Sequence, residues 1–242
     1  MRIAYREKLD NFAHDLILMC DTVQAIMSQA SRALLTAALQ PAEDGLSLSD
    51  ELEELRTRCE ERAVSLLALE NPMAKDLRQV VSSIYIVEDL YRMGQLAKHI
   101  AKSARRRHPN HVVQEEFMGY LEELARLVDE MCSRTRNALI DPDPQLALEL
   151  ASDDDAVDDI NHHLITILTQ RDWKYSTRSA VDLAMLSRFY ERYADHCVNV
   201  AARILYLSTG MLPDEYLARR ADEDRRQDME AHFAALERQF RR

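Results

Sequence analysis

The chain has 242 residues; 47% are apolar, 6% are aromatic, four are Gly and six are Pro. This length suffices for one large domain or two smaller ones with a substantial core. So few glycines exclude Gly-rich phosphate loops and a hairpin-rich β fold, and the composition favours an all-helical protein. With 31 basic and 42 acidic side chains the formal charge is −11, which argues against a role for the whole protein on nucleic acid or anionic membranes.

Prolines separate the apolar-periodic segments of the chain. Because proline is disfavoured inside helices, each one is expected to mark a helix boundary. The intervening segments predict six helices, near residues 3–40, 46–70, 73–107, 112–140, 144–170 and 175–209. Asn71-Pro72 and Asp143-Pro144 have the pattern of an N-cap followed by a first helical residue. They are expected to begin the third and fifth helices.

Apolar residues in the first and fourth segments recur at alternating spacings of four and three, which predicts helices packed side by side in bundles. The six segments also form two sets of three. A shift of 100 residues overlays the third helix on the sixth and places Arg78 on Arg178 and Arg92 on Arg192. The expected fold is all-α: two three-helix bundles in tandem, over residues 1–108 and 109–212, followed by a charged tail over 213–242.

The charged tail keeps apolar spacings of four and three at Met229, Phe233, Leu236 and Phe240. It is interpreted as a loosely docked terminal helix or a frayed tail. The alternative is a helix that docks on a partner or on a second copy of the chain.

The cysteines and the N-terminus indicate the compartment. Four widely spaced cysteines without a C-x-x-C pair predict reduced, buried thiols. The charged N-terminus has no signal-peptide core, and charges interrupt every long apolar stretch, so neither a transmembrane helix nor direct membrane insertion is expected. The expected location is the cytoplasm.

Five aspartates lie within residues 153–159, beyond the first turns of the fifth helix. At about 100° per residue, Asp154 and Asp158 share one face of this helix, whereas Asp155 and Asp159 point away from it. His162 continues the row one turn later. The shared face also carries the residues that are expected to form the apolar seam: Ala147, Leu150, Asn161, Ile165 and Leu168.

The sixth helix repeats this arrangement with Glu191 and Asp195, which share a face with small residues such as Ala184 and Ser187. If the two seams meet, four carboxylates converge, and they must protonate, pair with arginine or hold a metal. His162 would add a nitrogen ligand. This donor set suits iron, zinc, manganese or magnesium without choosing among them. The alternative places the acids at the seam edge, paired with Arg188 or Arg192. His196 is expected at the surface or behind the ligands.

These residues carry a resemblance to a known family. The segment Phe189-Tyr190-Glu191-Arg192-Tyr193-Ala194-Asp195-His196 resembles the E-R-x-x-D signature of the PhoU family of phosphate-uptake regulators. The acidic run 153–159 resembles the second-helix motif of that family. Asp76-Leu77-Arg78 and Tyr91-Arg92-Met93-Gly94 are similar to the matching pieces of its first repeat. The resemblance covers about residues 5–210.

The resemblance implies tandem three-helix bundles that hold metal on E-x-x-x-D residues, here Asp154, Asp158, Glu191 and Asp195. It also implies a dimeric, non-enzymatic, cytoplasmic regulator. Such proteins restrain the high-affinity phosphate ABC transporter, with its ATPase subunit as a partner. They also relay phosphate sufficiency to a sensor histidine kinase, which lowers the expression of phosphate-starvation genes.

The first repeat departs from the family pattern. Tyr91 and Gln95 stand where the family has Glu and Asp, while Ser49 and Glu53 occupy the second-helix positions. Lys98 and Lys102 are expected on the face of Tyr91 and Gln95, so that an ammonium group opposes a cation and could neutralise Glu53. The hypothesis is therefore asymmetric: a metal site in the C-terminal half, and none or a weak one in the N-terminal half.

Two other classes of protein remain as alternatives. A ferritin-like di-metal oxidase needs two E-x-x-H motifs, and the nearest approach is the single segment Asp159-Ile160-Asn161-His162. A histidine phosphotransfer bundle would use one of the helical histidines, His14, His99 or His196.

Overall fold

The computed structural model describes residues 2–170 and 172–240, and the regular structure of these residues is helical throughout. The elements in chain order are α1 (Arg2–Thr36), α2 (Leu39–Leu69), α3 (Lys75–Arg107), the short 3-10 helix η1 (Glu115–Phe117), α4 (Met118–Ile140), α5 (Pro144–Gln170), α6 (Thr177–Thr209) and α7 (Pro213–Phe240).

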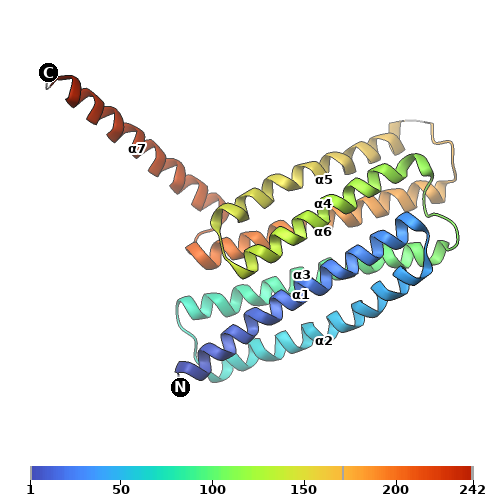
Figure 1. Cartoon of the computed structure of the whole chain (residues 1–242), viewed down its shortest axis with the longest axis horizontal. Helices are drawn as coiled ribbons and strands as arrows, with labels where there is room; N and C mark the ends of the chain where they lie inside the picture. Colours follow the sequence, from blue (N-terminus) through green and yellow to red (C-terminus); the bar gives the residue numbers. More distant parts are fainter. Residues whose placement is uncertain (1, 171, 241–242) are drawn as a thin grey trace.

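The first six α-helices form a slab of two three-helix bundles, as predicted (Figure 1). Helices α1, α2 and α3 pack on one another, as do α4, α5 and α6, and the bundles join through the pairs α1/α4 and α3/α6. Seen down the shortest axis of the molecule, α1 and α4 lie on the near broad face and α3 and α6 behind them. Helices α2 and α5 therefore form the outer edges of the slab.

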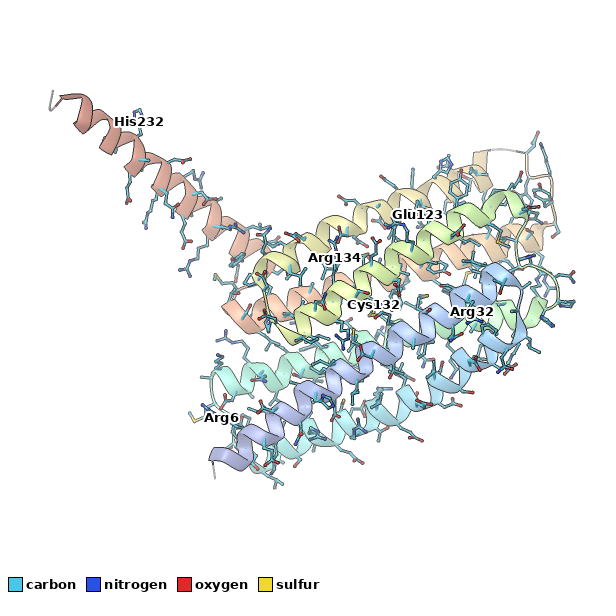
Figure 2. The ribbon with its side chains drawn as sticks, viewed as in Figure 1. Arg6, Arg32, Glu123, Cys132, Arg134 and His232 are labelled. Carbon is cyan, nitrogen blue, oxygen red and sulfur yellow. The ribbon has the colours of Figure 1, made fainter. Side chains whose placement is uncertain are left out.

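The core continues through the junction between the bundles. Tyr190 of α6 is fully buried, and its hydroxyl lies 2.9 Å from the hydroxyl of Ser31 on α1. Cys132 of α4 faces α1, where its sulfur lies 3.9 Å from that of Cys20 (Figure 2). All four cysteines are free and buried, so the predicted interior position of the thiols is confirmed.

Several predicted helix boundaries are wrong; α4, for example, begins at Met118 rather than near residue 112. Helix α2 begins at Leu39 and contains Pro41, which the first turn tolerates because its backbone nitrogen needs no intrahelical acceptor there. Asn71-Pro72 lies in the connection before α3, where Asn71 and Ala74 adopt positive φ angles of 49° and 48°. Asp143 does cap α5 as predicted, because its side chain accepts a hydrogen bond from the Gln145 backbone at 2.8 Å.

Helix α7 projects away from the slab (Figure 1). The charged tail is thus one helix of 28 residues, and His232 lies far from both bundles (Figure 2). At its base Arg220 donates a hydrogen bond to the Gln145 side chain at 2.7 Å. Among the described helices, none carries a stretch both long and apolar enough to cross a bilayer.

Candidate functional site

The seam of α5 contains Ala147 and Leu150 as predicted, but it departs from the prediction further along the helix. The buried residues Ala147, Leu150, Val157 and Leu164 recur at spacings of three, seven and seven, and Asp154 falls on this line four residues after Leu150. Asp158, His162 and Ile165 are exposed beside it. The prediction that Asp158 and Ile165 share the seam is therefore wrong, because 40° of helix rotation is enough to move a side chain from the contact to its edge.

Helix α6 brings its two acids against α5. Glu191 is only 7% exposed and Asp195 is half-buried. The Ser187 hydroxyl donates a hydrogen bond to Asn161 Oδ1 and fixes the register of the two helices. Counting one turn at a time from this bond in antiparallel helices, Asp158 lies level with Glu191, and Asp154 with Asp195. The sequence placed Asn161 and Ser187 on the facing sides without identifying the bond between them.

Two carboxylate oxygens at this contact are buried without a hydrogen-bond donor among the described residues: Asp154 Oδ1 and Glu191 Oε2. The other oxygen of Glu191 pairs with the Arg188 guanidinium. The predicted alternative, in which arginines pair with the acids, is therefore confirmed for this one oxygen. Arg192 makes no ion pair with a described residue. A buried acceptor left without a donor is costly, so this contact favours an added proton or an added cation.

The ionisation of these acids reflects the same lack of partners. Burial, reinforced by the charges of Asp158, Asp195 and Glu191, raises the pKa of Asp154 to about 7. Burial and the Asp195 charge also raise the pKa of Glu191, against the opposing effect of Arg188. Because the charges of Asp158 and Asp195 contribute to the raised pKa of both Asp154 and Glu191, the four acids interact as one electrostatic group.

These residues fit a bound cation in their chemistry. The donors are all carboxylate oxygens, two of them orphaned, which suits a hard metal ion. No set of three or more His, Cys, Asp or Glu side chains in residues 2–170 and 172–240 already surrounds a metal-sized space. A cation would therefore have to draw Asp158 and Asp195 toward the orphaned oxygens. His162 is exposed at the edge, and its predicted role as a ligand stays a prediction.

The remaining acids of the run have ordinary environments. Asp155 and Asp159 are exposed, as predicted. Asp153 accepts a hydrogen bond from Arg134 of α4 at 2.6 Å, an ion pair that the sequence did not indicate because its partner lies in another helix.

The corresponding place in the first repeat is internally satisfied. Ser49 is buried and donates to the Gly45 carbonyl, while Glu53 accepts a hydrogen bond from the Tyr91 hydroxyl at 2.7 Å. The Arg56 guanidinium lies 4.2 Å from the centre of the Tyr91 ring and also pairs with Glu88 at 3.0 Å. A side-chain cation thus stands close to these acids. Arg56 follows Glu53 by three residues, a spacing that could have identified it.

The predicted neutralisation of Glu53 by a lysine is not what the structure shows. Lys98 lies 3.7 Å from Asp50 instead, and the partner of Glu53 is the Tyr91 hydroxyl. His196 is also misplaced by the sequence: it is buried, and its Nδ1 lies 2.9 Å from Asp89 of α3. It therefore joins the two bundles rather than the carboxylate group.

Comparison with known proteins adds a family match to this geometry. The family model described as "PhoU domain" matches residues 16–104 and 121–204, once in each bundle. The phosphate-specific transport system accessory protein PhoU homolog 2 of Mycobacterium tuberculosis is 45% identical over 213 residues, which cover 88% of this chain and 100% of the relative. PhoU homolog 1 of Mycobacterium leprae is 42% identical over 215 residues, which cover 89% of this chain and 97% of the relative.

Solved structures show the same fold. The crystal structure of PhoU from Pseudomonas aeruginosa superposes with a TM-score of 0.76 at 24% identity, covering 86% of this chain and 100% of that one. The phosphate transport system regulatory protein PhoU from Streptococcus pneumoniae gives 0.75, also at 24% identity, covering 86% of this chain and 98% of that one. Helix α7 lies beyond residue 204, where the second family match ends.

Proposed function

This chain belongs to the PhoU family, and from that premise we propose that it regulates phosphate uptake and phosphate-starvation signalling through protein contacts. Its relatives are named as accessory proteins of a phosphate-specific transport system. The proposed partners are the ATPase subunit of the phosphate ABC transporter and the sensor histidine kinase of the same response. The proposed location is the cytoplasm, and the proposed state is a homodimer without catalytic activity.

The observation that carries this proposal is the doubled domain, which occupies both bundles of the slab. The contact between α5 and α6 supports a second proposal, that a metal ion stabilises the packing of these two helices. Asp154, Asp158, Glu191 and Asp195 would bind a divalent or trivalent metal ion, whose chemistry is charge neutralisation between packed helices. Arg188 orients Glu191 from the solvent side, and Asn161 and Ser187 keep the helices in register.

The first test is the recovery of named partners. Tagged full-length chain is used as bait in phosphate-replete cells, and the eluate is tested for the transporter ATPase and the sensor kinase. Both are expected with the wild-type chain, and a phosphate-starvation reporter should switch on in replete medium when the chain is deleted. Recovery of neither partner by a folded bait, together with an unchanged reporter, would overturn the proposed function.

A matched pair of variants tests whether the carboxylate site contributes. Asp154→Ala/Glu191→Ala removes the two acids whose buried oxygens lack a donor, whereas Asp155→Ala/Asp159→Ala removes two exposed acids of the same α5 run. Partner recovery should fall with the first pair and persist with the second. Equal partner recovery with both pairs of substitutions would show that the carboxylate site does not contribute to partner binding, and the regulatory role would then be independent of the proposed metal site.

A further inference from the structure

The slab has an uneven charge distribution that its total charge conceals. Helices α3 and α6 carry twelve Lys and Arg residues against six Asp and Glu residues, whereas the rest of the chain carries nineteen against thirty-six. The outer edges are acidic, because α2 has three basic and eight acidic residues and α5 has six acidic and no basic ones. Only the α3/α6 side of the slab therefore attracts an anionic surface.

The positive charge of α3 and α6 is largely free. Four of their six carboxylates are already in ion pairs, Glu88, Asp89, Asp182 and Glu191. Eight cations on the two helices form no ion pair with any described residue. Of these, Arg92 and Arg106 on α3 and Arg178 and Arg192 on α6 are exposed, and Lys102 and Arg203 are half-buried. They extend along the whole face rather than into one pocket.

Exposed apolar side chains stand at both ends of the same face. Val81 and Tyr85 on α3 are 39% and 49% exposed, while Val181 and Met185 on α6 are 56% and 48% exposed. The antiparallel packing of α3 and α6 carries these pairs to opposite ends, because Tyr85 lies under Arg203 and His99 stacks on Phe189. Each end thus combines apolar residues of one helix with cations of the other.

We propose that the α3/α6 face docks on an anionic lipid bilayer as a peripheral surface. Each helix has 33 residues and is roughly 50 Å long, so a partner must be broad and flat to reach both ends. Cations interspersed with apolar and aromatic side chains suit lipid headgroups and the acyl boundary. A nucleic acid would gain nothing from the exposed valines and methionine. This inference does not rest on the proposed transport role.

The test is sedimentation of the full-length chain with vesicles of about half phosphatidylglycerol and half phosphatidylcholine. Binding is expected to these vesicles, to weaken strongly at about 0.5 M salt, and to be absent on phosphatidylcholine alone. The variant Arg92→Glu/Arg106→Glu/Arg178→Glu should bind about 100-fold more weakly. Circular dichroism of each variant confirms that it is folded.

The matched control reverses three arginines of the projecting helix, Arg219→Glu/Arg225→Glu/Arg226→Glu. Its formal charge equals that of the first variant, and it should bind within about threefold of the wild type. Absence of binding by the wild type, equal loss in both variants, or loss only in the α7 variant would each overturn the proposal. If the wild-type chain does not bind vesicles but the α3/α6 variant no longer binds the transporter ATPase, the α3/α6 face binds an acidic protein surface and the lipid proposal is wrong.

Discussion

The α2/α3 contact of the first bundle and the α5/α6 contact of the second treat their acidic side chains in opposite ways. In the first, Glu53 has the Tyr91 hydroxyl as a donor and Arg56 stands beside them. In the second, Asp154 and Glu191 each bury an oxygen that has no donor among the described residues. One fold therefore supports a satisfied polar cluster in one repeat and an unsatisfied acidic group in the other. Unsatisfied acids reduce stability, and this cost is the basis of the proposed cation site at this contact.

Replacing Asp154 should give the largest change in the stability of the metal-free protein. Because its pKa is about 7 when folded and near 3.8 when unfolded, the folded state binds the extra proton. Its stabilising effect is complete below pH 4 and is lost as the pH rises through about 7. Asp154→Asn should remove that loss and stabilise the chelated protein by about 1–2 kcal/mol at pH 8, after allowance for its partial exposure.

Denaturant unfolding of the chelated protein at pH 5 and pH 8 measures this effect. The wild type should be less stable at pH 8, and the difference should shrink in Asp154→Asn. The exposed neighbour serves as the control, because Asp155→Asn should leave the difference in place. Equal wild-type stability at both pH values would remove the contrast between the repeats.

The same chemical change in the first repeat should have the opposite sign. Glu53→Gln weakens the hydrogen bond from Tyr91, because an amide oxygen is a poorer acceptor than a carboxylate. The expected loss is about 0.5–1 kcal/mol in the free energy of unfolding at pH 8. Tyr91→Phe should produce a similar loss, and the double variant should cost little more than either single one. If Glu53→Gln stabilised the protein, both repeats would contain unsatisfied acids, and the contrast between them would be wrong.

The smallest effect should separate the two arginines that the sequence could not tell apart. Arg188→Ala removes the ion-pair partner of Glu191 and should cost the metal-free protein up to about 1 kcal/mol at pH 8. The loss should shrink at lower pH, where protonation of Glu191, whose pKa burial already raises, removes its charge. Arg192→Ala should change stability by only a few tenths. Thermal melts of both variants would show the reverse order if Arg192 were the true partner.

Periodicity and proline spacing were enough to predict the tandem bundles, since side chains repeated every three and four residues can be buried together only in packed helices. They did not predict the rotation of α5 about its own axis accurately enough to identify which residues face α6. Val157 and Leu164 lie one residue before Asp158 and Ile165, and both registers keep the same spacing. The partners of the charged groups could not be predicted either. Tyr91, Asp89 and Arg134 contact Glu53, His196 and Asp153 respectively, each on another helix, and the sequence does not show how these helices are aligned.

Metal content measured by elemental analysis tests the central contrast most directly. Three proteins are purified in parallel: the wild type, Glu191→Ala/Asp195→Ala, and Asp50→Ala/Glu53→Ala, which removes two acids of α2 from the first repeat. The wild type and the first-repeat variant should carry the same amount of metal per chain, and the α6 variant should carry none. Unchanged metal in Glu191→Ala/Asp195→Ala, or equal loss in both variants, would contradict the assignment of the cation to the second bundle.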